Sequence, residues 1–218
     1  MSTHPYWPLF DIRVRTPRLE IRLPTDDEIV ALIRVVDEQG IHDPAVMPFQ
    51  ISFTDQPSPQ RQRGSMQWFW RCRAEWSPDN WKFSGAVFVD GAVVGVQDLM
   101  ATDFRMLRSV NTGSWLGRDA QGKGLGKEMR AAILHLAFEG LGARQANSGA
   151  FLDNAASAAT SRSLGYEDNG VDAARQRDQA GAVQRFLLTR TRWEERRRDD
   201  ITIEGLEGCL DMFGASAD

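Results

Sequence analysis

The sequence predicts a mixed α/β domain of the α+β type, and three observations lead to this class. Segments that alternate apolar and charged residues, such as 18–23, indicate half-buried strands. Other segments, such as 125–139, repeat apolar residues at helical spacing. A β-hairpin signal stands near the middle of the chain. Because the expected strands and helices do not alternate strictly, we expect a mixed central sheet rather than a doubly wound parallel one.

The first helix has a clear start and a clear end. Residues 18–23 form the strand before it, and Thr25 follows as an N-cap, with acidic residues in the next turn. Glu28 stands three residues after Thr25, which is the spacing of a capping box. The apolar pattern then continues to Gly40, where we expect the helix to end.

A long proline-rich loop should follow this helix. Four prolines between Pro44 and Pro59 interrupt any regular pattern, and long loops in compact domains often bind ligands. Residues 60–76 are expected to form a second helix. Asp90-Gly91 then lies between two apolar runs, which is a strong short-range signal for a β-hairpin.

The second half of the chain continues with strands and helices. From the apolar patterns we expect three strands and two helices: strand 109–117, helix 125–139, strand 144–153, helix 154–165 and strand 182–190. We therefore expect one domain over residues 1–198, and residues 199–218 form a C-terminal extension whose structure the pattern does not define.

Composition excludes several classes of protein. The net charge of −4 argues against a dedicated nucleic-acid binder, which usually carries a basic face. Two isolated cysteines have no partners at metal-ligand spacing, so no metal site is expected, and free thiols fit a reducing compartment. No apolar run approaches the length of a membrane helix, and the N-terminus lacks a signal-peptide core. We expect a soluble, cytoplasmic protein.

A glycine-rich loop precedes the helix expected at 125–139. Glycines at 122, 124 and 126 let several backbone N–H groups point at one anion, and the helix N-terminus and Lys123 and Lys127 add positive charge. This combination predicts a diphosphate cradle. The spacing matches neither a P-loop nor the Gly-x-Gly-x-x-Gly dinucleotide fingerprint. A binder of another nucleotide phosphate remains an alternative.

The loop "QGKGLG" (121–126) resembles the acyl-CoA loop of the GNAT superfamily of N-acyltransferases. Three further stretches resemble the branch that contains the ribosomal-protein alanine and serine N-acetyltransferases: "TPRLEIRLPTDDE" (16–28), "SWLG" (114–117) and "DNAASAATSRSLGYEDNG" (153–170). They occur in the family's order. The resemblance implies a mostly antiparallel sheet, splayed in the middle and flanked by helices, with acyl-CoA in the V-shaped opening.

The resemblance also implies roles for individual residues. The backbone of the loop would hold the CoA pyrophosphate, and the main chain at the end of the preceding strand would pair with pantetheine. Asn154 would contact pantetheine, and Ser157, one turn later, would protonate the leaving CoA thiolate. The simpler interpretation is that Asn154 and Ser157 only cap their helix. The cofactor-binding residues are then Ser114, Trp115, Leu116, Gln121, Gly122, Lys123, Gly124, Leu125, Gly126, Lys127 and Asn154.

The sequence departs from this branch at the general base. The branch often carries a glutamate on the strand before "SWLG", and the corresponding residue here is Asn111, whose amide cannot usefully accept a proton. The acceptor ammonium must nevertheless lose a proton before it can attack the thioester. Four other residues are candidates for the base: His42, Asp43, Asp98 and Asp103.

The acyl group and the acceptor stay open at this point. Acetyl-CoA and succinyl-CoA are both candidate cosubstrates, and succinyl would be favoured if arginines from 61–73 and 105–108 converged on the acyl end. The acceptor amine could belong to a protein N-terminus, a lysine or a small molecule. A catalytically weak acyl-CoA-binding regulatory module is the alternative function. The apolar strand after residue 183 could also pair with a second subunit, so a homo-oligomer is a further alternative.

Overall fold

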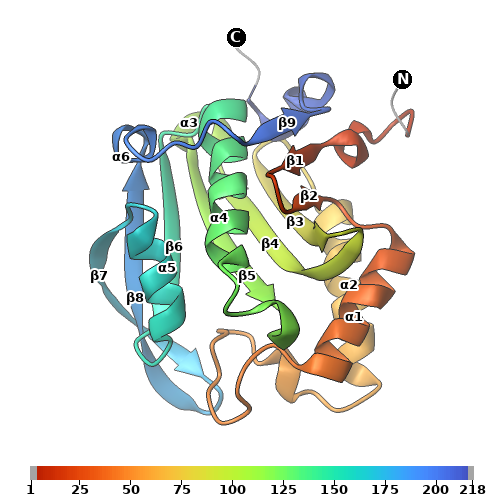
Figure 1. Ribbon diagram of the computed structural model, residues 1–218, viewed down its shortest axis with the longest axis vertical. Coiled ribbons are helices and arrows are strands. Elements are labelled where there is room, and N and C mark those ends of the chain that lie inside the picture. The colour runs from red at the N-terminus through yellow and green to blue at the C-terminus, as the bar shows by residue number, and fades with distance from the viewer. Residues whose placement is uncertain (1–3, 216–218) are drawn as a thin grey trace.

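A nine-stranded sheet runs through the structure, a computed structural model that describes residues 4–215 (Figure 1). The strand order is β7-β8-β6-β5-β4-β3-β2-β1-β9. The first and last three residues of the chain, which belong to the predicted domain and the predicted extension, lie outside the described residues. The strands are β1 (Arg13–Arg15), β2 (Glu20–Arg22), β3 (Asn80–Val89), β4 (Ala92–Thr102), β5 (Ser109–Leu116), β6 (Gln145–Phe151), β7 (Glu167–Gln176), β8 (Gln179–Thr189) and β9 (Thr202–Glu204).

Helices cover both faces of this sheet. α1 and α2 pack on one face, against β4 and β3, while α4 and α5 pack on the other, with α4 lying over β4 and β5 (Figure 1). The helices are α1 (Asp26–Gln39), α2 (Gln60–Ala74), α3 (Phe104–Leu107), α4 (Leu125–His135), α5 (Ala155–Ser163) and α6 (Arg190–Glu194). The two faces therefore present separate surfaces on which a ligand can be held.

Local signals predicted the main elements correctly. The capping box of α1 is present: Thr25 Oγ1 accepts from the N–H of Glu28, and the Glu28 carboxylate accepts from the N–H of Thr25 at 2.8 Å. The β3–β4 hairpin turns at Asp90 and Gly91, whose φ angles of 49° and 79° match the type I′ turn that Asp-Gly favours. Both elements follow from short stretches of sequence.

The predicted order omitted several elements, and β7 is the longest. β7 is polar and largely exposed, because it lies at the edge of the sheet and pairs with β8 alone. An edge strand with little buried surface lacks the alternating apolar residues from which a strand is predicted. The predicted order also lacked four short elements, because three to five residues are too few to show a periodic pattern. They are β1, β9, α3 and α6.

The sheet opens in its middle, as the resemblance implied. β5 and β6 form the parallel pair, with matched residues from Ser109–Gln145 to Asn111–Asn147. Beyond Asn111 the two strands no longer pair, although β5 continues to Leu116 and β6 to Phe151. The fold class is therefore confirmed: a mixed, mostly antiparallel sheet with a V-shaped opening between β5 and β6.

The C-terminal segment is joined to the same sheet. β9 pairs antiparallel with β1, and Phe213 is fully buried against Trp76 and Trp81. Both indole N–H groups donate to backbone carbonyls of this segment, Trp76 to Met212 at 2.8 Å and Trp81 to Phe213 at 3.1 Å. These contacts close the core at the end of the sheet opposite the V.

Candidate active site

The glycine loop leaves a helix N-terminus open to a ligand. Gly122 and Gly124 have φ angles of 72° and 78°, a region that residues with a Cβ rarely adopt. Gly124 is the N-cap of α4, and no side chain caps this helix. The first N–H groups of an α-helix have no partner inside the helix, so here they are available to an anion. Lys123 and Lys127 are exposed beside them.

Hydrogen bonds from two side chains, Gln121 and Arg18, hold this loop in place. The Gln121 amide donates to the carbonyls of Leu116 and Ile41, both at 2.8 Å. Arg18 donates to the carbonyl of Lys123 at 3.0 Å and to the buried Glu128 carboxylate at 2.6 Å. Arg18 was not predicted; the signal that could have found it is Glu128, an acid on the buried face of α4. The cradle is therefore shaped before a ligand arrives.

The end of β5 forms one wall of the V. The Trp115 side chain packs against the apolar cluster under α1 and α2, and the Trp115 carbonyl lies against Gly95 of β4. Ser114 is half-buried on the opposite face of the strand. Because β6 does not pair with this part of β5, the backbone groups along that edge have no strand partner there, although the Leu116 carbonyl accepts from Gln121.

The start of α5 forms the opposite wall. Asn154 is the N-cap of α5, and its Oδ1 accepts from the N–H of Ser157 at 3.2 Å. The capping role that the sequence offered as the simpler interpretation is thus present. Both residues are half-buried, and no acceptor for the Asn154 Nδ2 occurs among residues 4–215. Capping uses only the Asn154 oxygen, so its amide N–H groups can still serve a ligand.

Arg130 is a buried cation between the two walls, and the sequence did not single it out. It projects from α4, is 4% exposed, and donates to three hydroxyls: Ser114 at 3.0 Å, Ser148 at 3.2 Å and Ser161 at 3.4 Å. Its Nε has no partner, and no carboxylate pairs with it in the described part of the chain. Burial accordingly lowers the pKa of Arg130. The sequence signal that could have identified Arg130 is a charged residue within the apolar face of a predicted helix.

The four candidates for the general base occupy very different places. Both ring nitrogens of His42 have hydrogen-bond partners within the loop, the Asp43 carbonyl at 2.7 Å and the Thr54 hydroxyl at 2.8 Å. Asp43 caps a turn by accepting from the N–H of Ala45. Asp103 follows the far end of β4, before α3. Asp98 alone lies in the sheet beside β5, directly opposite Gly113.

The proline-rich loop crosses the open end of the V, and we call residues 41–58 the crossing loop. On one side Arg118 donates to the His42 carbonyl at 2.7 Å. On the other, the β7–β8 turn holds it, because Arg177 forms an ion pair with Asp55 and donates to the Pro44 carbonyl at 2.6 Å. Figure 1 shows the crossing loop between the start of α4 and the β7–β8 turn.

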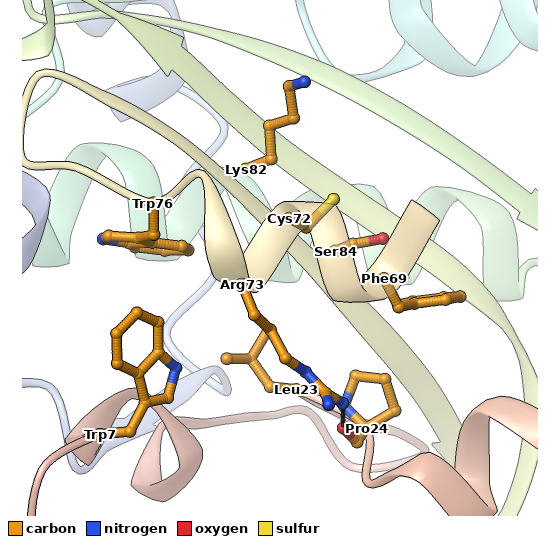
Figure 2. A pocket seen from close by; sticks show the side chains of 9 residues that line it. All are labelled: Trp7, Leu23, Pro24, Phe69, Cys72, Arg73, Trp76, Lys82 and Ser84. Atoms are coloured by element: carbon orange, nitrogen blue, oxygen red, sulfur yellow. Dashed lines mark hydrogen bonds between the residues drawn. The ribbon is translucent and has the colours of Figure 1, made fainter. Parts of the chain in front are cut away.

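Two of the arginines that could have favoured a succinyl group form ion pairs with α1 instead. Arg61 pairs with Asp37 and Arg73 pairs with Asp26, both on α1. Arg73 also lines a cavity of about 10 Å³ between α2 and the sheet, which Cys72 and Ser84 border as well (Figure 2). That space holds at most a single water molecule, so it is no substrate pocket.

Comparisons with known proteins agree with this geometry. Residues 18–167 match the acetyltransferase (GNAT) domain family. Solved structures with the same fold include RimL, the ribosomal L7/L12 alpha-N-protein acetyltransferase, in complex with coenzyme A (17% identity, TM-score 0.62, 80% of this chain and 95% of that one). Another is the acetyltransferase from Salmonella typhimurium that modifies the N-terminal serine of L7/L12 (16%, TM-score 0.64, 80% and 96%). A GNAT-family protein from Chromobacterium violaceum is also similar (16%, TM-score 0.66, 84% and 88%).

The matched region covers more than half of the chain, so the protein belongs to the GNAT acetyltransferase family. It is an acyl-CoA-dependent N-acyltransferase, which transfers an acyl group from CoA to an amine. At identities of 16–17% the solved structures support the fold alone. Within residues 4–215, no helix combines the length and apolar character needed to span a bilayer.

Proposed function

We propose that the protein holds acyl-CoA and an amine together and that the neutral amine attacks the thioester directly. The parting of β5 from β6 after Asn111 is the observation that carries this proposal. It opens a strand edge next to an uncapped helix N-terminus, so one extended ligand can meet both. An acyl-CoA has a diphosphate for the helix and amides for the strand.

In this proposal each wall of the V has a chemical role. The backbone of residues 121–127 holds the pyrophosphate, helped by the charge of Lys123. The main chain of residues 114–116 pairs with pantetheine, and one of its N–H groups polarises the thioester carbonyl. Asn154 donates to pantetheine, and the Ser157 hydroxyl protonates the departing thiolate.

The acyl group is proposed to be acetyl or succinyl, and Arg130 supports the second. A buried guanidinium with only hydroxyl partners has unused capacity to bind a carboxylate, and its position beside Ser114 lies next to the strand that would carry the thioester. Acetyl offers no group for this charge. The arginines of 61–73 that pair with α1 give no such support.

A protein α-amino group is the acceptor class we propose to test first, with lysine and small amines as the alternatives. RimL acts on the N-terminus of a ribosomal protein, and its fold is shared here. The free, buried thiols of Cys72 and Cys209 fit a reducing cytoplasm as the place of reaction.

Release of CoA in the presence of an amine panel tests the proposal. Peptides with free N-termini, lysine peptides and small amines should be compared with each acyl-CoA, and thermal shifts with acetyl-CoA, succinyl-CoA and ATP should be recorded alongside. We expect a CoA thioester, and not ATP, to raise the melting temperature. Tight CoA binding with no release for any amine would instead support the regulatory module.

A further inference from the structure

We propose that Asp98 is the general base that removes the proton from the acceptor amine, an inference that rests on the acyl transfer proposed above. In this step an ammonium proton passes to the Asp98 carboxylate, and the freed lone pair forms the C–N bond at the thioester carbonyl. The C–S bond then breaks, its electron pair leaves with sulfur, and the second proton lost by the attacking nitrogen is balanced by the proton that the Ser157 hydroxyl relays to that sulfur. Asn111, which replaces the expected glutamate, needs no catalytic role.

The strand register places Asp98 beside the reacting strand. Asp98 pairs with Gly113 of β5 on one side and with Ser84 of β3 on the other. It shares its face of the sheet with Val96, which packs under α1 and α2, so it lies on the side opposite α4. Neighbouring strands are about 4.8 Å apart, so the carboxylate lies one strand spacing from the β5 backbone.

The two carboxylate oxygens of Asp98 are in different situations. Oδ1 accepts from the Ser84 hydroxyl at 2.6 Å, which orients the group. Oδ2 is directed at Gly113, because a Cβ added to that glycine would lie 3.5 Å from it. Ser84 is the side-chain donor to the Asp98 carboxylate among residues 4–215, and no ion pair there involves this carboxylate. One oxygen is thus held, and the other faces β5.

Gly113 keeps this oxygen within reach of a ligand. Asn111 is exposed, and Gly113 and Asp98 are half-buried, so the floor beside β5 is open on this face. Cys72 on α2 lies near enough for the Asp98 charge to add to burial in raising the pKa of its thiol. A carboxylate in such a place is desolvated by the protein yet accessible from one direction, which is what proton transfer to a base requires.

The electrostatic environment makes Asp98 a usable base near neutral pH. Burial raises the pKa of Asp98 to about 6, and the Ser84 hydrogen bond opposes this effect. Of the groups facing it, Cys72 on α2 is a neutral thiol whose pKa burial raises to about 12. The Lys82 ammonium on β3 lies 5.2 Å from the Trp68 ring centroid, and Asn111 and Gly113 on β5 are uncharged. Asp98 is therefore ionised at pH 7.5.

The pKa of the acceptor amine also affects this proton transfer, whichever carboxylate accepts the proton. A protein α-amino group has a pKa of about 8, roughly two units above that of Asp98, while a lysine side chain at about 10.4 is more than four units above it. Proton transfer from lysine is therefore less favourable by a further factor of roughly 100 or more. Asp98 thus suits an N-terminal amine better than a lysine.

Asp98→Asn tests the assignment, because asparagine keeps the shape and can still accept from Ser84. We expect turnover at pH 7.5 to fall by about 100-fold to 1,000-fold, with the Kd for acetyl-CoA unchanged. In the wild type, kcat should rise with pH around an apparent pKa near 6, and this limb should vanish in the variant. Asp98→Glu should recover part of the rate. Asp90→Asn, in the remote β3–β4 turn, is the matched charge-removal control and should behave as wild type.

The experimental outcomes distinguish a failure of the Asp98 assignment from a failure of the acyl transfer on which it rests. A folded Asp98→Asn variant with turnover within about twofold of wild type, or with the acidic limb intact, would exclude Asp98 while leaving acyl transfer in place. A wild-type protein that binds acyl-CoA but releases CoA with no amine would overturn both. Gly113→Ala gives a second readout: the added methyl group should desolvate Asp98 further and move the limb to higher pH, and an unmoved limb in the folded variant would count against the geometry.

Discussion

Side chains of opposite charge lie on the two faces of β5, Arg130 on one and Asp98 on the other. Gly113 and Ser114 are consecutive residues, so they face opposite sides of the sheet. On the α4 side Ser114 accepts a hydrogen bond from the buried cation Arg130. On the α2 side Gly113 leaves room for the half-buried carboxylate of Asp98. Neither charge has an ion-pair partner in the described residues.

This difference suits a reaction that moves charge across the strand. We call the α2 side of β5 the acceptor side and the α4 side the cofactor side. In the proposed acyl transfer a proton leaves the ammonium on the acceptor side, while negative charge develops on sulfur on the cofactor side. A carboxylate on the first side and a guanidinium on the second favour these two changes together. Buried, unpaired charges are costly to folding, so their presence here fits a catalytic rather than a stabilising purpose.

The largest effect on acyl-CoA binding should come from a change on the cofactor side. Gly124→Asp combines a Cβ at a φ of 78° with a negative charge in the phosphate cradle. We expect the affinity for acyl-CoA to fall at least about 100-fold, or about 2.7 kcal/mol, as measured by calorimetry. Gly142→Asp is the matched control, because Gly142 has a φ of 69° and open space around it but lies elsewhere. Unchanged affinity in a folded Gly124→Asp protein would contradict the loop assignment.

Removing the acceptor-side charge should make the protein more stable. Because the folded-state pKa of Asp98 is raised, from 3.8 to about 6, the folded protein binds its proton more tightly than the unfolded chain does. Ionising Asp98 therefore costs stability as the pH rises from about 4 to 6. Asp98→Asn should gain up to about 3 kcal/mol relative to wild type above pH 6 and almost nothing below pH 4, as chemical denaturation at several pH values would show. A gain that does not depend on pH would contradict the buried charge.

The cofactor-side charge should affect the choice of acyl group. Arg130→Met removes the guanidinium while keeping much of its volume. If a succinyl carboxylate uses Arg130, kcat/KM for succinyl-CoA should fall about 10-fold to 100-fold more than that for acetyl-CoA. Equal losses for the two thioesters would restrict Arg130 to positioning its three serines.

Ser157→Ala should have the smallest effect of the four. Loss of the hydroxyl should lower kcat by about tenfold and leave the Kd for acyl-CoA unchanged, because the proton reaches sulfur only as the C–S bond breaks. The backbone N–H that Asn154 caps is still present in this variant, so α5 should keep its stability. A kcat equal to that of wild type would remove Ser157 from the mechanism.

The two sides also differ in how much of them could be predicted from the sequence. The cofactor side is nearly continuous: the end of β5, the glycine loop and α4 occupy residues 114–135, and backbone binding leaves its mark as glycines at fixed spacing. Sequence patterns therefore predicted acyl-CoA as its ligand, while the individual binding residues stay a prediction. Arg130 was missed because a single charge within a helix does not reveal which way it points.

The acceptor side is built from separate parts of the chain. Asp98 was one of four candidates, and only the register between β4 and β5 distinguishes it from the others. The contacts of the β7–β8 turn with the crossing loop join residues more than 120 positions apart, and β7 itself carries no apolar period. Strand register and tertiary contacts of this kind leave no local pattern.

Changes in the crossing loop could alter the entrance for the acceptor separately from the rest of the site. It is attached to the cofactor side through Arg118 and through the Ile41 carbonyl, which accepts from Gln121, and to the other half of the sheet through Arg177. Inserting or deleting residues there would widen or narrow the entrance while the phosphate cradle and the reacting strand kept their shapes. New acceptors can thus be recruited at little risk to the chemistry, provided that both fastenings survive.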